Sequence, residues 1–198
     1  MEIKTYVAGP FMTNTYLIIN DKKGIIVDPT IDLEKYIDDI KKIEITAILL
    51  THCHIDHIAS AHLFDAPIYM SKIDAINIKN NRVNLSDTFG IPFIFPSNNI
   101  IGLDDMEVLS LNNLKIECIL TPGHTSGGMC FLINDYLFSG DTLFQVGIGR
   151  TDFPTGNMND LKNSLLKLNC LPKGTKIYPG HGELSTLEFE LKYNPYLK

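Results

Sequence analysis

The segment Thr51–Ser60, THCHIDHIAS, carries three histidines and one aspartate within six residues, directly after the apolar run Ile45–Leu50, ITAILL. A short apolar run of this kind is typical of a buried strand. The cluster at its end has two interpretations: packing and capping residues that lie together by chance, or ligands of a metal. The run H-x-H-x-D-H arises by chance in on the order of one in several thousand chains, which favours ligands. The candidates are His52, His54, Asp56 and His57.

The spacing of these residues suits two neighbouring metal ions. His52 and His54 are two positions apart on extended backbone, so their side chains point to the same side and can reach one ion. Asp56 and His57 follow after the chain turns into a helix, where their direction changes, and they can reach a second ion beside the first. Cys53 points the opposite way from the two histidines, and we expect it to face the core.

Three further candidates also follow apolar runs that are typical of strands. His124 lies in CILTPGHTSGG, Asp141 in YLFSGDTLF and His181 in KIYPGHG. Strand ends at one edge of a sheet converge, so separate segments can direct their side chains to one point. Asp141 is the natural carboxylate to bridge two ions, which together can hold an attacking and a leaving oxygen. His62 has no glycine-containing turn, and we expect it on the face of a helix, outside the site.

The composition is that of an ordinary soluble protein. The 198 residues fit one domain, residues 1–198, large enough to fold without disulfides or metal. The formal net charge is −6 and the basic residues are scattered, so we expect no nucleic-acid partner. The amino terminus lacks the pattern of a secretory signal and no apolar run reaches membrane-spanning length, so we expect a cytoplasmic protein without membrane contact. The four cysteines lack C-x-x-C spacing, which predicts reduced and mostly buried thiols.

The hydrophobic pattern alternates between strands and helices in both halves of the chain. It predicts strands over residues 3–9, 14–20, 25–28, 44–50, 66–70, 106–111, 114–120, 129–133, 136–140 and 175–180. A hairpin is expected to turn through Asp21–Gly24, and others at Asn112–Asn113 and Asn134–Asp135. Helices are expected over residues 28–43, up to Phe64, after Ser71, over 158–168 and near the carboxyl end. Locally paired strands followed by helices in each half predict an α+β fold, a sheet-on-sheet core with helices on its outer faces.

These motifs together resemble the metallo-β-lactamase superfamily. The resemblance extends over nearly the whole chain and rests on IIVDPT, THCHIDH, TPGHTSGG, LFSGDTLF, GIGRTDFPTGN, IYPGHG and NPYL. It implies an αββα sandwich of two packed mixed sheets. It also implies that His52, His54 and His124 hold one metal ion, that Asp56, His57 and His181 hold the other, and that Asp141 bridges them.

Within the superfamily the chain is similar to the compact, single-domain, glyoxalase II-like hydrolases. This likeness implies a dinuclear thioesterase that acts on S-lactoylglutathione or a related hydroxyacyl thioester through a metal-bridging hydroxide. Two divalent metal ions are expected per chain. Zinc is the expected metal, and iron and manganese are also compatible with these ligands. Asp56 is the candidate to accept the proton of the attacking water. Asp28 has two interpretations, a partner that orients a ligand imidazole or a turn and capping residue.

The alternative function is an iron-dependent persulfide dioxygenase of the same fold, whose members share GRTDF. The residue after that stretch is Pro154, which favours the hydrolase. Arg150 either binds a substrate carboxylate or pairs with Asp152, and Tyr178 either lines the substrate pocket or belongs to the core. The loop over residues 84–99 contains Phe89, Phe93 and Phe95. These phenylalanines either form a wall of the substrate pocket or pack in a small separate core.

Overall fold

The computed structural model describes residues 1–91, 93–95 and 99–197. Its first six-stranded sheet contains, in order, β1 (Glu2–Ala8), β2 (Thr13–Asn20), β3 (Lys23–Val27), β4 (Glu44–Leu49), β5 (Ile68–Ser71) and β6 (Ile100–Leu103). The first three strands pair antiparallel, and β3 to β6 run parallel. The sheet is therefore mixed, and its parallel part directs several strand ends to one edge.

The second six-stranded sheet contains, in order, β14 (Ser185–Thr186), β13 (Lys176–Pro179), β10 (Tyr136–Gly140), β9 (Met129–Ile133), β8 (Leu114–Leu120) and β7 (Val108–Leu111). β10 and β13 are parallel, whereas the remaining neighbours are antiparallel. A small separate hairpin is formed by β11 (Leu143–Phe144) and β12 (Gly147–Ile148).

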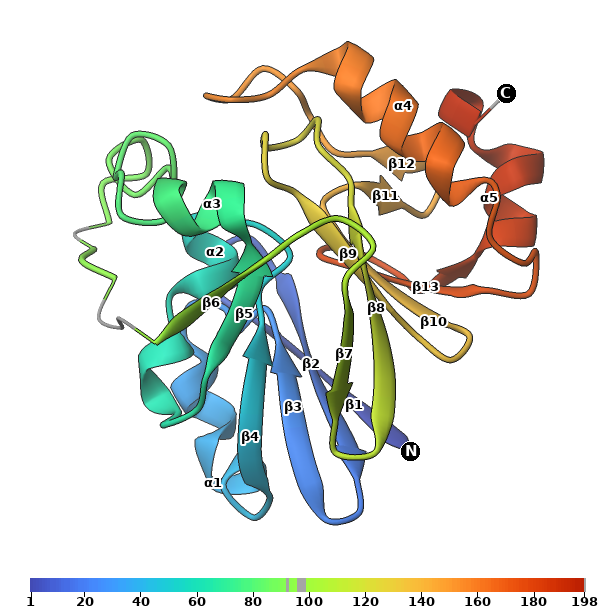
Figure 1. Cartoon of the computed structure of the whole chain (residues 1–198). Helices are drawn as coiled ribbons and strands as arrows, with labels where there is room; N and C mark the ends of the chain where they lie inside the picture. Colours follow the sequence, from blue (N-terminus) through green and yellow to red (C-terminus); the bar gives the residue numbers. More distant parts are fainter. Residues whose placement is uncertain (92, 96–98, 198) are drawn as a thin grey trace.

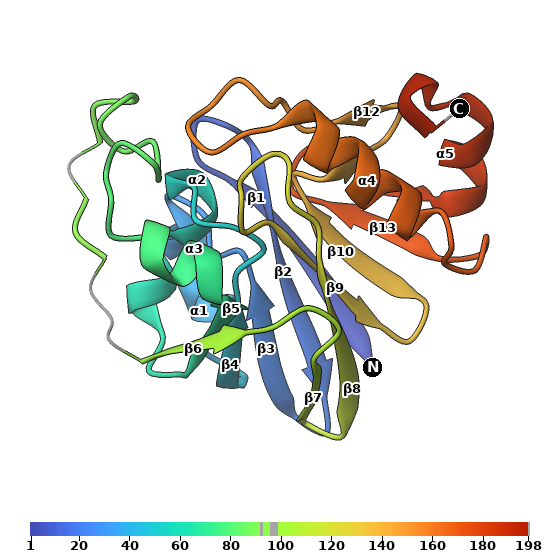
Figure 2. The same ribbon diagram turned by 45° about the horizontal axis from the view of Figure 1, so that its top comes forward.

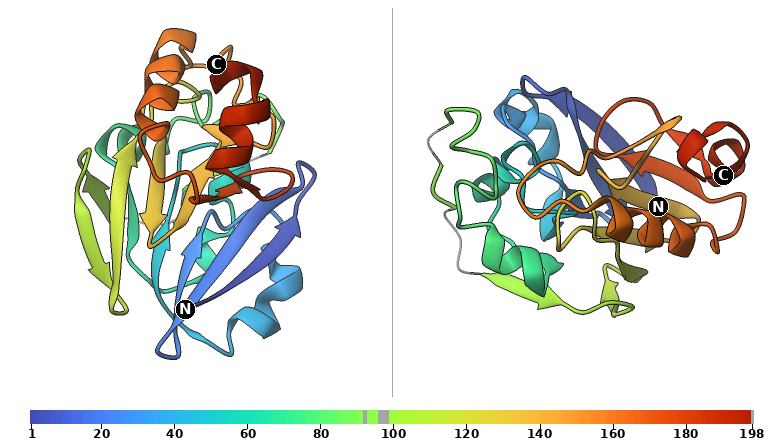
Figure 3. Two further views of the ribbon diagram at one scale, coloured as in Figure 1. Left: turned by 90° about the vertical axis from the view of Figure 1, so that its right-hand side faces the viewer. Right: turned by 90° about the horizontal axis from the view of Figure 1, so that it is seen from above.

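Helices cover the outer face of each sheet. On one side lie η1 (Leu33–Tyr36), α1 (Ile37–Ile40), α2 (Ile55–Ile58), η2 (Ala61–Leu63) and α3 (Lys72–Asn77). On the other side lie α4 (Met158–Leu168), α5 (Leu187–Tyr193) and η3 (Pro195–Leu197). Figures 1 and 3 show the strands between these two helical groups. The predicted sandwich of two mixed sheets with helices outside is confirmed.

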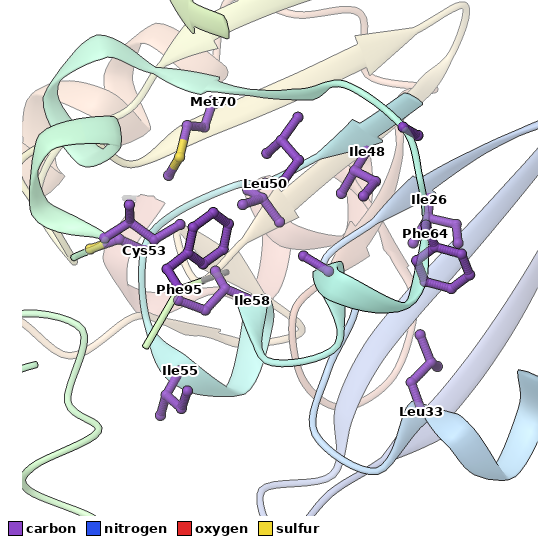
Figure 4. Packing of buried hydrophobic residues seen from close by; sticks show 14 of the residues in the cluster. Ile26, Leu33, Ile48, Leu50, Cys53, Ile55, Ile58, Phe64, Met70 and Phe95 are labelled. Atoms are coloured by element: carbon purple, nitrogen blue, oxygen red, sulfur yellow. The ribbon is translucent and has the colours of Figure 1, made fainter. Parts of the chain in front are cut away.

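Buried apolar side chains form three clusters, one between the two sheets and one beneath each group of helices. Along β2, Ile18 faces the cluster between the sheets, whereas Leu17 faces the cluster beneath the first helical group, as the two-residue period of a strand requires. The third cluster lies beneath α4. Cys53 belongs to the same cluster as Phe95 and Ile58 (Figure 4), so the expectation that it faces the core is met.

The predicted helix over residues 28–43 is wrong as a continuous element. The chain forms only η1 and α1 there, four residues each. Asp32, directly before η1, has a φ of 61°, in the left-handed region, and its side chain caps no helix. A right-handed helix cannot extend through this conformation, so only the residues after it become helical.

The first hairpin turns inside the predicted segment Asp21–Gly24, but over two residues only. Asp21 and Lys22 both have positive φ and form the turn, whereas Gly24 lies inside β3. A Cβ on Gly24 would lie 2.7 Å from Cδ1 of Ile45 and 2.9 Å from Cδ1 of Leu17. The glycine therefore permits close packing of the strand and is not needed for the turn.

Sequence patterns did not predict β6, β11, β12 and β14, most of which are too short to show alternation. The predicted hairpin turns at Asn112–Asn113 and Asn134–Asp135 do join β7 to β8 and β9 to β10. No helix in the described part of the chain is both long and apolar enough to cross a membrane.

Candidate metal centre

The seven predicted ligands come from four segments that follow strands. β4 leads into the segment with His52 and His54, and Asp56 and His57 lie in α2, which follows directly. The remaining three follow β8, β10 and β13: His124, Asp141 and His181. Backbone hydrogen bonds tie these segments together, from Met129 N to Thr51 O and from Gly180 N to Gly140 O. The segments therefore meet at one end of the sandwich, which Figure 2 turns toward the viewer.

The structure brings the seven side chains into two groups of three with one carboxylate between them. One ligand atom from each of His52, His54 and His124 lies within 4.8 Å of the others, and the same holds for Asp56, His57 and His181. Asp141 reaches both groups. Its oxygens lie 3.4 Å from Nε2 of His124, 3.5 Å from Nε2 of His57 and 3.5 Å from Nε2 of His181.

Hydrogen bonds outside the centre fix the orientation of four imidazoles. Nδ1 of His57 lies 2.9 Å from Oδ2 of Asp28, and Nδ1 of His52 lies 3.0 Å from Oγ1 of Thr51. Nδ1 of His124 lies 2.7 Å from the carbonyl oxygen of Arg150, and Nδ1 of His181 lies 3.1 Å from the carbonyl oxygen of Phe11. A proton on each Nδ1 satisfies these acceptors and leaves a lone pair on Nε2, which faces inward. This tautomer is the one that a metal ligand requires.

Asp28 is a partner of the ligands. Its oxygens lie within 4.8 Å of ring nitrogens of both His52 and His57, as a third ligand group would. However, Oδ1 accepts from the backbone N–H of Thr51 at 2.8 Å, and Oδ2 accepts from the Thr51 hydroxyl at 2.6 Å and from His57. The structure therefore favours the interpretation in which Asp28 orients a ligand over the one in which it caps a turn.

The donor set fits metal ions on grounds of hydrogen bonding alone. Nε2 of His52 and Oδ1 of Asp141 are buried without a hydrogen-bond partner among the described residues. Nδ1 of His54 faces Nε2 of His124 at 2.9 Å, although the tautomer of His124 leaves a lone pair there. Buried acceptors that converge in this way are favourable only when a cation or proton lies between them. Imidazole nitrogens and carboxylate oxygens are ligands of zinc and iron.

The electrostatics differ between the two groups. Burial, followed by neighbouring imidazoles, holds the pKa of His52 well below its usual value, and burial lowers the pKa of His54 to about 3. Both rings are therefore neutral and able to donate lone pairs. Burial opposes the charge of Asp56 and Asp141, but histidines, His57 first, outweigh it and hold both carboxyl pKa values well below the usual range. Both carboxylates are therefore ionised.

The same carboxylates act on the histidines beside them. Burial would lower the pKa of His57, but Asp56, Asp141 and Asp28 raise it well above its usual value. Burial also opposes the charge of His181, whereas Asp141 and Asp56 raise its pKa to about 9. A metal ion bound in this group must therefore displace protons.

Two residues that support the centre were missed by the sequence analysis. Asp74 is fully buried, and its Oδ2 accepts from the backbone N–H of Cys53 at 3.1 Å and from Oγ1 of Thr125 at 2.8 Å. It thus joins the segment of His52 and His54 to that of His124. Ser71 and Asp74 have the spacing of a helix-capping pattern at the start of α3. This pattern already accounts for Asp74 in the sequence and gives no sign of its contacts with Cys53 and Thr125.

Thr13 is the second missed residue. Its hydroxyl donates to Oδ2 of Asp56 at 3.1 Å, and its backbone bridges that of His181. No local signal points to it, because Thr13 and Asp56 are 43 positions apart in the chain.

A cavity of about 460 Å³ opens above the centre, and its walls are mainly apolar. Arg150 is among the residues that line it, and its guanidinium pairs with Asp152 through bonds of 2.6 and 2.5 Å, so the predicted pairing is present. Tyr178 does not line this cavity. Its ring lies 5.3 Å from the rings of Tyr16 and Phe138, and the half-buried side chain packs against the cluster between the sheets.

The remaining predicted residues divide between core and cavity. Phe89 lines the cavity, whereas Phe93 and Phe95 pack in the cluster beneath the first helical group, so each interpretation of the 84–99 loop holds for part of it. Its two prolines, Pro92 and Pro96, lie outside the described residues. His62 is exposed in η2, where its Nδ1 contacts the Ala59 carbonyl oxygen at 2.9 Å.

Comparison with known proteins agrees with the fold. The model of the metallo-β-lactamase superfamily matches residues 8–181. A "probable metallo-hydrolase" of Streptococcus pyogenes is 36% identical over 92% of this chain and 84% of its own length. A "probable polyketide biosynthesis zinc-dependent hydrolase", BaeB of Bacillus velezensis, is 34% identical over 100% of this chain and 86% of its own. The crystal structure of the BLEG-1 B3 metallo-β-lactamase superposes with a TM-score of 0.92 at 33% identity and covers 99% of each chain. The chain therefore belongs to the metallo-β-lactamase superfamily.

Proposed function

We propose that this metallo-hydrolase is a dinuclear thioester hydrolase of the glyoxalase II-like type and that zinc is its preferred metal. Its substrates would be thioesters, a class that includes S-lactoylglutathione and related hydroxyacyl thioesters. The observation that carries the dinuclear proposal is the position of Asp141, whose carboxylate lies within 3.5 Å of histidines from both ligand groups. A shared carboxylate of this kind is what a two-ion site needs.

His52, His54 and His124 would hold one ion, and Asp56, His57 and His181 the other, with Asp141 between them. Bound zinc ions would supply Lewis acidity, which polarises a carbonyl and makes water more acidic. The residues of the chain hold the geometry: Asp28, Thr51 and two backbone carbonyls keep the imidazole lone pairs directed inward.

Asp56 is the residue that we assign to the attacking water. It lines the cavity, and the Thr13 hydroxyl holds its Oδ2 at 3.1 Å. Because His57 and its neighbours keep this carboxylate ionised, it can accept a hydrogen bond from water and so orient the water toward the carbonyl carbon. Its low pKa makes orientation the larger part of this role, with proton acceptance as a transient step.

The cavity lining favours a substrate with a good leaving group. Among the described residues that line it, the ionisable side chains are five metal ligands and Arg150. None of these is a free general acid. A thiol of pKa about 8.5 can leave as the thiolate, whereas the nitrogen of an amide must be protonated before it leaves. A thioester therefore suits this site better than an amide.

The test is one preparation loaded separately with zinc and with iron. S-Lactoylglutathione, acetyl and phenylacetyl thioesters of the same thiol, and a β-lactam are assayed without oxygen, and glutathione persulfide is assayed in an oxygen electrode. We expect thioester hydrolysis with zinc, without oxygen uptake. Turnover only with iron and persulfide, accompanied by oxygen uptake, would transfer the assignment to the dioxygenase.

A further inference from the structure

Three phenylalanines form a continuous aromatic wall along the cavity, and we call Phe11, Phe89 and Phe153 the aromatic arc. The rings of Phe11 and Phe89 lie 4.6 Å apart, and those of Phe89 and Phe153 lie 6.5 Å apart. Both ends of the arc touch the metal centre. The ring of Phe153 lies 5.7 Å from that of His54, and the Phe11 carbonyl oxygen bonds to His181.

The middle of the arc is held in place by the backbone. The N–H of Phe89 donates to the carbonyl oxygen of Leu85 at 3.1 Å, and the carbonyl oxygen of Asn84 accepts from the N–H of Ile55 at 2.8 Å. Ile55 begins α2, which carries Asp56 and His57. The loop that presents Phe89 is therefore tied to the segment that presents the ligands.

The polar groups of the cavity are few and already engaged. Apart from the metal ligands, Arg150 is the one polar side chain among the described lining residues. Its guanidinium is paired with Asp152 and lies 4.1 Å from the centre of the Phe153 ring. No serine, threonine, asparagine or glutamine side chain lines the cavity in the described part of the chain. A substrate hydroxyl or amide there would lose its water without gaining a partner.

We propose that the preferred substrates are thioesters with an apolar acyl group, aromatic or branched aliphatic, which packs against the aromatic arc. This inference rests on the proposed function. In the reaction, water adds to the thioester carbonyl and the carbon–sulfur bond breaks, giving the carboxylic acid and the thiol. Lactoyl and other short hydroxyacyl groups are then poorer substrates, because the described residues that line the cavity offer their hydroxyl no side-chain partner besides the metal ligands and Arg150.

The apolar group belongs to the acyl side of the substrate for a chemical reason. Biological carrier thiols of the glutathione and pantetheine kinds have amide groups close to the sulfur. Those amides need hydrogen-bond partners, which the arc lacks, so they fit the open mouth of the cavity better than its wall. The acyl group, next to the same carbonyl carbon, is then the part that the arc encloses.

The experiment compares phenylacetyl, acetyl and lactoyl thioesters of one thiol on the zinc-loaded protein, in the wild type, in Phe89→Ala and in Phe189→Ala. The two phenylalanines are a matched pair: they are 39% and 38% exposed, and Phe189 packs on Tyr193 with ring centres 4.7 Å apart, outside the cavity. We expect kcat/KM for phenylacetyl to exceed that for lactoyl by about tenfold or more in the wild type and in Phe189→Ala. The ratio should fall at least threefold in Phe89→Ala.

Calorimetric binding of phenylacetate and lactate to the same three zinc-loaded proteins gives a readout without turnover. We expect phenylacetate to bind at least tenfold more tightly than lactate, with the preference lost in Phe89→Ala and kept in Phe189→Ala. If thioesters are hydrolysed but lactoyl equals or exceeds phenylacetyl, or Phe89→Ala leaves the ratio unchanged, the inference is overturned and the proposed function stands. If no thioester is hydrolysed but phenylacetate keeps its Phe89-dependent preference, the proposed function fails and the apolar subsite is retained. If neither is seen, both fail.

Discussion

Oδ2 of Asp28 accepts a hydrogen bond from Nδ1 of His57 at 2.9 Å. The same oxygen accepts from the hydroxyl of Thr51 at 2.6 Å, and that hydroxyl oxygen lies 3.0 Å from Nδ1 of His52. His52 and His57 belong to different ligand groups. One buried carboxylate thus orients an imidazole in each half of the centre, directly for His57 and through Thr51 for His52.

Asp28→Ala should weaken binding of both metal ions, by about tenfold to a hundredfold, because both imidazoles lose the acceptor that fixes their tautomer. The measurement is competition for zinc against a chelator of known affinity. The exposed Asp38→Ala is the control and should match the wild type. If Asp28→Ala keeps wild-type affinity for both ions, the orienting role assigned to Asp28 is wrong.

Asp141→Ala should retain fewer metal ions per chain than His57→Ala, because Asp141 contacts both ligand groups and His57 belongs to one. Elemental analysis after dialysis is expected to show close to one retained ion in His57→Ala and less in Asp141→Ala. Circular dichroism should show both variants folded, because a core of this size does not depend on the metals. A metal-free wild type that is unfolded would instead show that the site is structural.

Asp74→Ala should destabilise the protein and alter the first ligand group. The backbone N–H of Cys53 and the hydroxyl of Thr125 would lose a buried acceptor, at a cost of about 1–3 kcal/mol for each group. Urea unfolding of the metal-free protein measures the stability, and the visible spectrum of the cobalt-substituted protein reports the ligand geometry. The exposed Asp65→Ala serves as control. Unchanged stability and an unchanged cobalt spectrum would remove Asp74 from the support of the centre.

Thiol labelling should separate the four cysteines. Cys53, Cys118 and Cys130 are buried and Cys170 is exposed. Burial raises the pKa of Cys118 to about 12 and that of Cys130 to about 11, so both stay protonated and unreactive at pH 8. A thiol reagent at this pH should modify one cysteine in the native protein and four in denaturant, and Cys170→Ser should reduce the native value to zero. Rapid native labelling of a second thiol would contradict the burial.

The ligands could be found from the sequence because their signal is local. His52, His54, Asp56 and His57 lie in one short run after an apolar strand, and His124 and His181 lie in glycine-containing turns. The helix over residues 158–168 could also be predicted from the sequence, because it has an amphipathic pattern and is preceded by Asn157, whose side chain caps its first turn.

What the sequence did not predict depends on contacts between distant residues. Thr13 supports Asp56 and Asp74 supports Cys53 across 43 and 21 positions, and neither pair has a local pattern. Phe89 and Phe95 lie in the same loop, yet one faces the cavity and the other the core. That division follows from how the loop is tied to Ile55 and packed, which the spacing of the phenylalanines does not encode.

The most direct test of the two-ion centre is anomalous diffraction at the zinc edge from crystals of the zinc-loaded protein. Two peaks are predicted in each chain, about 3.5–4 Å apart. One should lie among His52, His54 and His124 and the other among Asp56, His57 and His181, with Asp141 in contact with both. A single peak at full zinc occupancy, or two peaks of which one lies outside these residues, would contradict the account.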